Sequence, residues 1–407
     1  MNKEWKNYKL GELCETISIT HKFNKNKLVF LNTGDIDRGK FLHSKYTAIK
    51  DMPGQAKKTI KKNDILFSEI RPANGRYAFV YFDSDDYVVS TKLMVIRCRE
   101  AILPKYLYQF ITSKTITDWL QHLAESRSGT FPQITFDQVA DIEINLPSKV
   151  EQKTISEFLS ALDDKIELNR QTNQTLEAIA QAIFKEWFVD FNFPGTTGEM
   201  QDSELGQIPK GWRVGKLGEV VAVQNGYAFK SNDFKDAGEI KIIKIKNISG
   251  NLVDVVSTQF VDREIVEKLD KKYKIEIGSL LIAMTGAEVG KIGLIPKSEK
   301  QLWLNQRVGM FVEKVKYANH FIYILLGSEE YQNTLQNSAL GSAQPNISSS
   351  VIENISTIMP PVKVILNFGE LVNPLFERIL SNYDESATLT AIRDSLLPKL
   401  MNGEIEV

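Results

Sequence analysis

The sequence predicts an α+β protein in which two homologous, mixed α/β domains are separated by two long helices. We expect these helices to pack as an antiparallel coiled coil with pseudo-two-fold symmetry. Three observations predict this fold class. The second half of the 407-residue chain repeats the first, each copy begins with strand-like runs between turn residues, and each copy ends in a long stretch with helical apolar spacing.

Short segments recur in the two halves at a nearly constant offset. Residues 5–13 (WKNYKLGEL) match residues 212–220 (WRVGKLGEV) at an offset of 207, and residues 63–80 match residues 278–295 at an offset of 215. Self-similarity over such a long period indicates a duplicated unit. The offset changes in loops, which two modules that read different things would explain, as would neutral drift at the surface.

Each copy divides into a strand-rich part and a helical part. We expect mixed α/β domains at residues 1–147 and 205–360, and helical spacers at residues 148–192 and 361–407. The hydrophobic content of 43% supports sizeable cores, and the charged content of 25% is ordinary for a soluble protein.

The first spacer predicts one long helix. Ser148 and Glu151 form a capping box at its start. Residues 149–189 contain no Pro or Gly and would span about 60 Å as a helix. Their apolar residues alternate spacings of four and three, which is typical of a coiled-coil seam, and Asn169 and Asn173 interrupt it. The apolar seam residues are Ile155, Leu159, Leu162, Ile166, Leu176, Ala180 and Ile183.

The second spacer repeats this seam with one difference. Asn382 and Ser386 occupy the places of Asn169 and Asn173. Pro374 lies inside the segment and predicts a break or kink near Asn373, and Pro398 should limit the final turns. The apolar seam residues are Phe368, Val372, Leu375, Ile379, Leu389 and Leu396.

The natural partner of each amphipathic helix is the other one. Antiparallel packing about a central pseudo-two-fold axis would bring Asn169 close to Asn382, where polar residues fix the register of a coiled coil at some cost in stability. The alternative is that both side chains face solvent. The same packing would place the two domains at opposite ends of a rod and the two chain ends close together.

The end of the first helix is unusually rich in aromatic residues. Residues 182–191 read AIFKEWFVDF, and Phe184, Trp187 and Phe188 exceed what one seam can cover. These side chains could pack beneath the second domain, or they could form a docking patch for another subunit.

A search for catalytic chemistry finds only imperfect motifs. Residues 286–292 (GAEVGKI) resemble a phosphate-binding loop, but the glycine spacing is short and no Ser or Thr follows Lys291. Residues 373–376 (NPLF) resemble an amino-methyltransferase motif but lie in a helical seam, and the nuclease-like spacing of residues 236–241 arises often by chance. The histidines show no metal-ligand spacing: His21, His43, His122 and His320. A binding or scaffold protein fits best.

Polar loops in matched places of the two copies are candidates for nucleic-acid binding. Arginine pairs with guanine and Asn or Gln with adenine, whereas Ser, Thr and Lys mostly hold phosphates. The candidates in the first copy are Arg71, Asn74, Arg76, Lys92, Arg127, Ser128, Thr130 and Gln133. Those in the second copy are Lys291, Arg307, Ser342, Gln344, Asn346 and Ser348. Any one of them could be an ordinary solvated loop residue, and their recurrence is what supports the hypothesis.

The net charge and the cysteine content limit the possible functions and the cellular location of this chain. A net charge of −1 and a pI near 6.5 argue against a simple basic coat for nucleic acid, although basic residues can still gather on one face. Cys14 and Cys98 are too few for a disulfide scaffold or a zinc site. No secretory signal and no apolar run long enough to span a membrane are visible, so we expect a cytoplasmic protein.

Together these features resemble the specificity subunit of type I restriction-modification systems. The resemblance covers essentially the whole chain. It rests on segments that open the second domain, close each domain and end each helix. In order these are LGQIPKGWRVGKLGEV (205–220), GTFPQIT (129–135), GSAQPNIS (341–348), AIFKEWFVDF (182–191) and RDSLLPKLMNGEI (393–405).

The resemblance implies a function. Each mixed domain would be a target-recognition domain that binds one half of a split, asymmetric DNA site, and the helices would act as a ruler for the unread gap. Two modification subunits, which carry S-adenosylmethionine chemistry on adenine, and two restriction subunits, which use ATP and Mg²⁺, would join the complex. This chain would itself have no catalytic residue, metal or cofactor.

Two alternatives make different predictions. A DNA methyltransferase or nuclease with its own site would be an enzyme, and a methyltransferase would bind S-adenosylmethionine by itself. A two-domain DNA-binding regulator would have no enzymatic partner, so co-purification with a methyltransferase would separate it from a specificity subunit.

Overall fold

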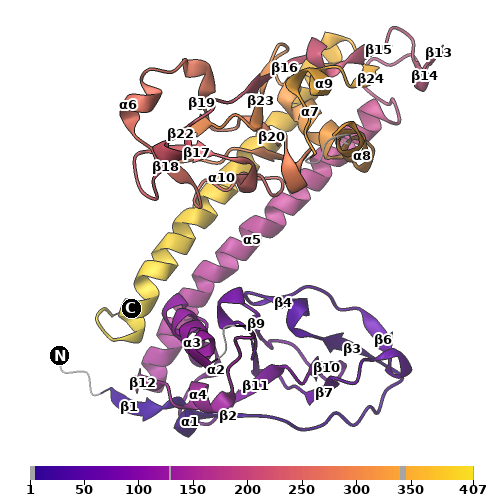
Figure 1. The fold of residues 1–407 in the computed structure, drawn as a ribbon. Coiled ribbons are helices and arrows are strands. Elements are labelled where there is room, and N and C mark those ends of the chain that lie inside the picture. Colours follow the sequence, from indigo (N-terminus) through magenta and orange to yellow (C-terminus); the bar gives the residue numbers. More distant parts are fainter. Residues whose placement is uncertain (1–4, 128–129, 340–344, 407) are drawn as a thin grey trace. The chain divides into compact units, whose positions relative to one another are not determined.

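The computed structural model describes residues 5–127, 130–339 and 345–406, and the chain divides into two compact units (Figure 1). Unit 1 consists of Met1–Ile166 and Thr388–Val407, and unit 2 consists of Glu167–Ala387. Two long helices, α5 (Lys149–Phe188) and α10 (Val362–Met401), each contribute one part to each unit.

Unit 1 is a mixed α/β unit. Its strands are β1 (Lys6–Lys9), β2 (Cys14–Thr16), β3 (Lys27–Leu31), β4 (Ile36–Asp37), β5 (Lys40–Phe41), β6 (Tyr46–Ala48), β7 (Ala56–Thr59), β8 (Ile65–Ser68), β9 (Tyr77–Phe79), β10 (Tyr87–Ser90), β11 (Leu93–Cys98) and β12 (Glu143–Leu146). Its shorter helices are α1 (Leu10–Leu13), α2 (Pro104–Ile111), α3 (Lys114–Arg127) and α4 (Phe136–Ala140). The strands form sheets of order β6-β3-β10-β7 and β2-β11-β8-β9, with the pairs β1-β12 and β4-β5.

Unit 2 has a closely related set of elements. Its strands are β13 (Met200–Ser203), β14 (Gly206–Pro209), β15 (Arg213–Lys216), β16 (Val221–Asn225), β17 (Ile240–Ile243), β18 (Gln259–Val261), β19 (Lys274–Ile275), β20 (Leu280–Ala283), β21 (Ile292–Leu294), β22 (Gln301–Leu304), β23 (Val308–Glu313) and β24 (Ser356–Met359). Its shorter helices are α6 (Arg263–Val266), α7 (Ala318–Gly327), α8 (Glu329–Ser338) and α9 (Ser349–Glu353). The strands form sheets of order β16-β23-β20-β21 and β18-β17-β22-β19, with the pairs β15-β24 and β13-β14.

The two units share one sheet plan. The order β16-β23-β20-β21 repeats β2-β11-β8-β9, and β18-β17-β22-β19 repeats β6-β3-β10-β7. The repetition includes the parallel pairing, because β3 runs parallel to β10 as β17 does to β22. The prediction of two repeated, mixed α/β domains is therefore confirmed.

The repeated opening segment closes each unit. Strand β1 pairs with β12 just before α5, and β15 pairs with β24 just before α10. The shared glycines are needed at this point for space. A Cβ on Gly11 would lie 3.0 Å from the Cβ of Ala140, and a Cβ on Gly218 would lie 3.1 Å from the carbonyl oxygen of Glu353.

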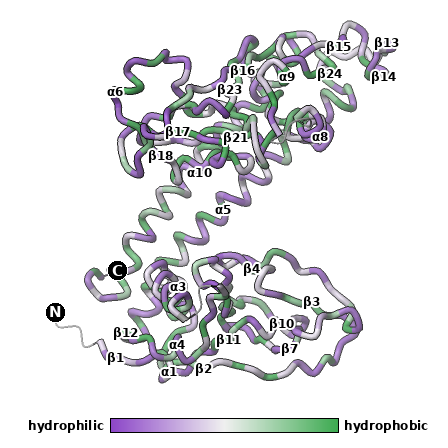
Figure 2. The backbone as a smooth tube through the Cα atoms, viewed as in Figure 1, coloured by the Kyte–Doolittle hydropathy of each residue, from purple (hydrophilic) through white to green (hydrophobic). Residues whose placement is uncertain are grey.

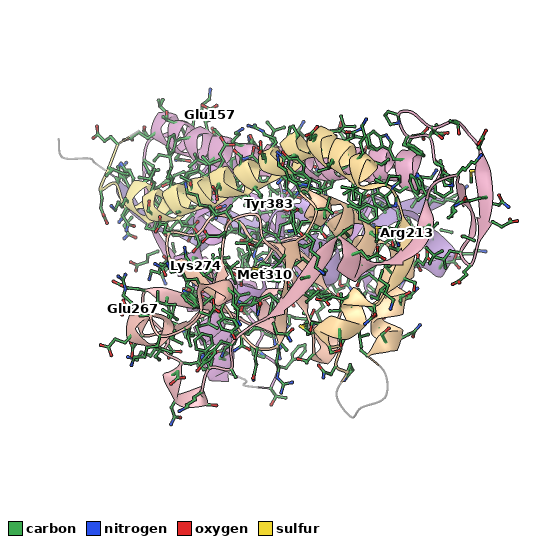
Figure 3. All side chains as sticks on the ribbon, turned by 90° about the horizontal axis from the view of Figure 1, so that it is seen from above. Glu157, Arg213, Glu267, Lys274, Met310 and Tyr383 are labelled. Carbon is green, nitrogen blue, oxygen red and sulfur yellow. The ribbon has the colours of Figure 1, made fainter. Side chains whose placement is uncertain are left out.

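The shared glutamates hold the turn that follows each opening strand. Glu12 accepts the backbone N–H of Lys9 at 2.8 Å, and Glu219 accepts that of Lys216 at 2.9 Å. In unit 2, Arg213 of β15, labelled in Figure 3, also pairs with Glu219. The match between residues 5–13 and 212–220 thus has a structural role in closing each unit.

Each unit buries apolar strands and part of both long helices. All four residues of β8 and all four of β20 are buried. In unit 1, Ile155 and Leu159 of α5 share a core with Leu400 of α10. In unit 2, Phe184 of α5 shares a core with Phe368 of α10. Hydrophobic and hydrophilic residues alternate along both helices, as the predicted seam requires (Figure 2).

The start of α5 follows the prediction. The Ser148 hydroxyl accepts the backbone N–H of Glu151 at 3.3 Å, and the Glu151 carboxylate accepts the backbone N–H of Ser148 at 3.1 Å. This reciprocal pair is a capping box and satisfies amides that the helix itself leaves unpaired.

The break expected at Pro374 does not occur. Helix α10 is continuous from Val362 to Met401 and also passes Pro398. Pro374 is exposed, so water can reach the carbonyl group that lacks its usual N–H donor. Buried Val372 and Phe376 hold the helix on both sides of it, and this packing outweighs the local preference of proline.

Candidate nucleic-acid interface

A polar turn of residues 69–76, which we call the unit 1 turn, connects β8 to β9. Its first residues bond to the segment that precedes α4. The N–H of Arg71 donates to the carbonyl of Pro132 at 3.1 Å, and the N–H of Ile134 donates to the carbonyl of Glu69 at 2.8 Å. The turn is therefore held at two points by a segment that is distant in the sequence.

The corresponding segment of unit 2, residues 284–291, is held in the same way, and we call it the unit 2 turn. The N–H of Gly286 donates to the carbonyl of Pro345 at 3.0 Å, and the N–H of Ile347 donates to the carbonyl of Met284 at 2.9 Å. These residues occupy the matching positions of the repeat. The duplication thus extends to individual hydrogen bonds.

A third bond fixes each turn to the strand beside it. The N–H of Glu69 donates to the carbonyl of Lys92, and the N–H of Met284 donates to the carbonyl of Arg307, both at 3.1 Å. Peptide groups make all of these bonds, so side chains can differ between the units without changing the turn. The arrangement can present different side chains on one scaffold.

Four of the predicted residues in unit 1 are exposed: Arg71, Asn74, Lys92 and Thr130. Arg71 precedes a 3₁₀ turn, Pro72–Asn74, within the unit 1 turn, and the N–H of Asn74 donates to the carbonyl of Arg71 at 2.9 Å. Lys92 immediately precedes β11. These side chains are free to meet a phosphate or a base edge.

Two predicted residues of unit 1 are instead half-buried and engaged within the unit. Arg76 donates from Nη1 to the carbonyl of Ile36 at 3.0 Å and lies 3.6 Å from Asp37 Oδ1. Gln133 donates from Nε2 to Glu69 Oε2 at 3.0 Å. A DNA contact by either side chain would break these bonds, so the geometry supports positioning of the turn as their role.

A largely buried lysine adds to the contacts that hold the unit 1 turn. Lys58 Nζ lies 4.0 Å from Glu69 Oε1 and donates to the carbonyl of Leu93 at 2.8 Å. Burial lowers the pKa of Lys58, while the Glu69 carboxylate opposes that shift. The network joins the base of the unit 1 turn to β7 and β11.

Among the predicted residues of unit 2, Arg307 and Asn346 are exposed. Lys291 forms an ion pair with Glu288 inside the unit 2 turn. Ser348 caps α9, because its hydroxyl accepts the backbone N–H of Val351 at 3.3 Å. Its role in the fold is therefore structural.

The structure does not describe the side chains of the other predicted loop residues. Ser128, Ser342 and Gln344 lie outside the described residues. Arg127 is the last residue of α3, and its side chain is likewise outside the described part.

The sequence reasoning missed the hairpin beside the unit 1 turn. Strands β4 and β5 are joined by Arg38 and Gly39, and their backbone N–H groups donate to the carbonyls of Gly75 and Tyr77 at 2.7 and 2.8 Å. The side chain of Arg38 is exposed, and its stem crosses Gly75 so closely that a Cβ there would meet Arg38 Cγ at 2.7 Å. An Arg-Gly pair between short strands is the sequence signal that could have found it.

The docking patch predicted at the end of α5 is wrong for the residues chosen. Phe184, Trp187 and Phe188 are each at most 8% exposed and belong to the core of unit 2. The ring of Phe188 lies 4.9 Å from that of Phe321 and 5.0 Å from that of Phe368. The alternative, in which these aromatic residues pack beneath the second domain, is confirmed.

Other apolar residues of the long helices do remain exposed. They include Phe158 and Ile392 in unit 1, and Ile179 and Leu371 in unit 2, besides Val150, Leu168 and Val362. Phe158, Ile179 and Leu371 come one position before a seam residue, and Ile392 precedes Arg393, which takes the place of the seam residue Ala180; Phe158 matches Leu371 in the repeat as Ile179 matches Ile392. In an antiparallel pair of helices, this position lies along one edge of the seam on both helices. Each unit therefore exposes two apolar residues, one from each long helix, at positions that match in the repeat.

The polar seam residues are buried in unit 2 and bond to one another. Asn382 donates from Nδ2 to Asn173 Oδ1 at 2.7 Å, and Asn173 donates to the carbonyl of Ile379 at 3.2 Å. Asn169 donates to Glu385 Oε2 at 2.9 Å and to the carbonyl of Asn382 at 3.4 Å. Asn169 and Asn382 are thus in contact, and neither faces solvent.

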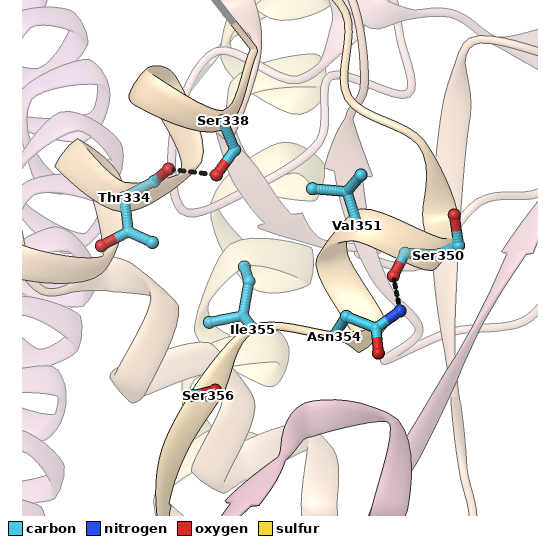
Figure 4. Close-up of a pocket in the computed structure, with 7 residues that line it drawn as sticks. All are labelled: Thr334, Ser338, Ser350, Val351, Asn354, Ile355 and Ser356. Carbon is cyan, nitrogen blue, oxygen red and sulfur yellow. Dashed lines mark hydrogen bonds between the residues drawn. The ribbon is translucent and has the colours of Figure 1, made fainter. Parts of the chain in front are cut away.

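A shallow hollow of about 450 Å³ lies beside α9 in unit 2 (Figure 4). Hydroxyl, amide and aliphatic groups line it, and none of its lining residues is ionisable. It is lined by Thr334, Ser338, Ser350, Val351, Asn354, Ile355 and Ser356. Such a lining has no general acid, base or metal ligand.

The described part of the chain holds no group of three or more His, Cys, Asp or Glu side chains arranged for a metal ion. Within the same residues, no helix has both the length and the apolar character needed to cross a bilayer. The described residues thus form duplicated units that present exposed basic and amide side chains on anchored turns, which is an architecture of paired binding modules.

Comparison with known proteins agrees with this architecture. The model of the type I restriction modification DNA specificity domain matches the chain twice, at residues 2–178 and 209–393. The chain is 36% identical to the type I restriction enzyme HindI specificity subunit of Haemophilus influenzae over 462 aligned positions, which cover 99% of this chain and all of that protein. It is 30% identical to the MjaIX specificity subunit of Methanocaldococcus jannaschii, over 76% of this chain and 71% of that one.

The fold has a solved relative as well. The S subunit of a type I restriction-modification system from M. genitalium superposes with a TM-score of 0.59 at 17% identity, over 98% of this chain and 96% of that one. The chain therefore belongs to the type I restriction-modification specificity subunits, which are non-catalytic DNA-recognition subunits with two target-recognition domains.

Proposed function

We propose that each unit reads one half of a bipartite DNA site through its turn and the segments anchored to it. The observation that carries this proposal is the repetition of the same backbone bonds in both turns while the exposed side chains differ. Unit 1 presents Arg71, Asn74 and Lys92, whereas unit 2 presents Arg307 and Asn346. A constant scaffold with different polar groups suits two readers of two different half-sites.

Two of these residues, one in each unit, suit the same role in DNA binding. Lys92 and Arg307 occupy matching positions, are both basic and exposed, and both precede a central strand. Their carbonyl groups hold the turns, so their side chains start from fixed points. We infer that both contact phosphates and set the position of each unit on the duplex, which carries no sequence information by itself.

The long helices are proposed to act as a ruler between the half-sites. Helices α5 and α10 each contain 40 residues and occupy matching positions of the repeat. We propose that they form an antiparallel coiled coil with pseudo-two-fold symmetry, and that buried Asn169, Asn173 and Asn382 fix its register. The length of this seam would then determine the gap between the half-sites.

The exposed apolar pairs are proposed as docking points for modification subunits. Phe158 with Ile392, and Leu371 with Ile179, offer matched pairs in the two units. Matched surfaces suit two copies of one partner. We propose that two modification subunits bring S-adenosylmethionine, and that two restriction subunits bring ATP and Mg²⁺, to the complete complex.

An exchange of one recognition segment tests the proposed function. Residues 63–135 would be replaced by the aligned segment of the Haemophilus influenzae relative, and the complex with its modification subunits would be mapped for methylated sites. We expect the parent to methylate a bipartite motif, and the hybrid to change one half of it only. A contiguous parental motif, or a change in both halves, would refute the proposal.

A further inference from the structure

Two arginines of unit 1 have backbone conformations that side chains disfavour. Arg38 has φ of 43° and Arg71 has φ of 45°, both in the left-handed region. A residue with a Cβ is strained in that region, and glycine is not. Strain of this kind is retained where the surrounding structure holds it, most often at functional sites.

The matching positions of unit 2 carry glycine. Gly286, with φ of 78°, takes the place of Arg71 and makes the same backbone bond. Gly250 takes the sequence position of Arg38, because the bridge between Ile248 and Val253 repeats the pairing of β4 with β5, but Gly250 does not share the left-handed backbone of Arg38. Unit 2 therefore has glycine in the same left-handed conformation at the place of Arg71, and glycine in a different backbone conformation at the place of Arg38, whereas unit 1 carries a left-handed arginine at each.

No polar contact within the described part of unit 1 explains why either position carries a guanidinium group. Both side chains are exposed, and neither forms a hydrogen bond or an ion pair with any of the described residues. Arg76 in the same turn shows the contrast, because it donates to the carbonyl of Ile36. The stem of Arg38 packs over Gly75, but neither guanidinium gains a hydrogen bond or an ion pair within the described residues in return for the strained backbone.

Both arginines are bonded to the ends of the same 3₁₀ turn, Pro72–Asn74: Arg71 precedes it, and Arg38 bonds through its backbone to Gly75, which follows it. The carbonyl of Arg71 accepts the N–H of Asn74 at 2.9 Å, and the N–H of Arg38 donates to the carbonyl of Gly75 at 2.7 Å. Their backbones are therefore fixed relative to each other, and the guanidinium groups project from anchored starting points. Such pre-organisation favours paired hydrogen bonds over loose charge attraction.

We propose that Arg38 and Arg71 form a specificity-determining pair of unit 1 that reads guanine bases in the major groove. Two N–H groups of a guanidinium match O6 and N7 of guanine, and this pattern separates guanine from the other bases. The inference rests on the proposed function and adds the residues and the base to it. It assigns no such pair to unit 2, where glycine occupies both positions.

The test replaces each arginine with the residue found in unit 2. Arg38→Gly, Arg71→Gly and the double variant would be studied in the complex with modification subunits, by methylation mapping and by thermal unfolding. We expect each single variant to lose discrimination at one guanine of one half-site by about tenfold or more, with the other half-site unchanged. Relief of strain should leave the midpoint of unfolding unchanged or raise it by roughly 2–4 °C.

A lysine variant separates base reading from phosphate binding. Arg71→Lys keeps the charge and loses the planar fork, so we expect the same guanine to be relaxed with little loss of overall affinity. Asn63→Gly is the matched control, because Asn63 is also left-handed, with φ of 73°, and lies in unit 1 outside the turn. It should leave the motif unchanged.

Four results would overturn the inference. Weakening that is uniform across all sequences would assign the arginines to phosphates, and a fall in the unfolding midpoint would assign them to the fold. An unchanged bipartite motif would remove them from recognition while leaving the proposed function intact. A parent complex that reads no bipartite motif would overturn both proposals.

Discussion

At the residue scale, one buried ion pair matters more to unit 1 than many surface pairs. Arg97 donates from Nε and Nη2 to the two carboxylate oxygens of Asp64 at 2.7 and 2.8 Å, and the Asp64 side chain is 1% exposed. The same carboxylate accepts the N–H of Lys61 at 2.7 Å. Removing one partner of such a pair leaves the other poorly satisfied.

We expect Asp64→Ala to lower the free energy of unfolding of unit 1 by about 3 kcal/mol, measured by urea denaturation of the full chain. The control is Glu239→Gln. Glu239 pairs with Arg263 where the two side chains are 71% and 59% exposed. This control should cost less than about 1 kcal/mol. Equal losses of unfolding free energy in the two variants would contradict the expectation that the buried pair stabilises the protein more than the exposed pair does.

The roles of individual side chains were the hardest feature to predict from the sequence. Residue type correctly suggested that Arg71 and Lys92 are available, but it gave the same suggestion for Arg76, whose partner Ile36 lies 40 positions earlier in the sequence. Arg38 was missed because its relation to the unit 1 turn depends on how a hairpin folds back on Gly75. Neither long-range pairing leaves a local pattern in the sequence.

At the element scale, the seam of the helices was predictable and the effect of proline was not. The alternation of four and three residues located α5 and α10, because burial of one face requires that period. Pro374 was expected to break α10, but buried neighbours on both sides keep the helix continuous. A proline on an exposed face can be tolerated when packing supplies more free energy than the lost bond removes.

The amide pair in the seam gives a prediction of non-additivity. Asn173→Leu should lower the free energy of unfolding by about 1–3 kcal/mol, because it leaves the buried amide of Asn382 without the acceptor it now uses. Adding Asn382→Leu should recover most of that loss, since both polar groups are then gone. A double-mutant cycle by urea denaturation measures the energetic coupling between Asn173 and Asn382. A double variant whose loss of unfolding free energy equals the sum of the two single losses would disprove the coupling.

The exposed apolar pairs give a prediction about assembly. Phe158→Glu should remove one modification subunit from the complex, and Leu371→Glu should remove the other, as measured by native mass spectrometry. Val150→Glu is a matched control, because Val150 is 76% exposed on the same helix as Phe158 and lysine occupies its place in the repeat. Full assembly of both glutamate variants would exclude these residues from docking.

At the scale of the whole molecule, duplication was the strongest signal in the sequence. Matching segments such as residues 5–13 and 212–220 predicted two related units before any strand was placed, and the sheets repeat strand by strand. The pairing of particular strands was beyond prediction, because β3 with β10 and β17 with β22 join strands that have several other strands between them in the sequence. Short strands carry too little pattern to choose such partners.

The central claim is that two recognition domains read separate half-sites at a distance determined by the helices. The most direct test inserts one heptad into α5 and one into α10 near the middle of the seam, and maps methylation by the assembled complex. Seven helical residues add about 10 Å, or about three base pairs at 3.4 Å each. We expect a longer gap between two unchanged half-sites, whereas an altered half-site with the original gap would contradict the account.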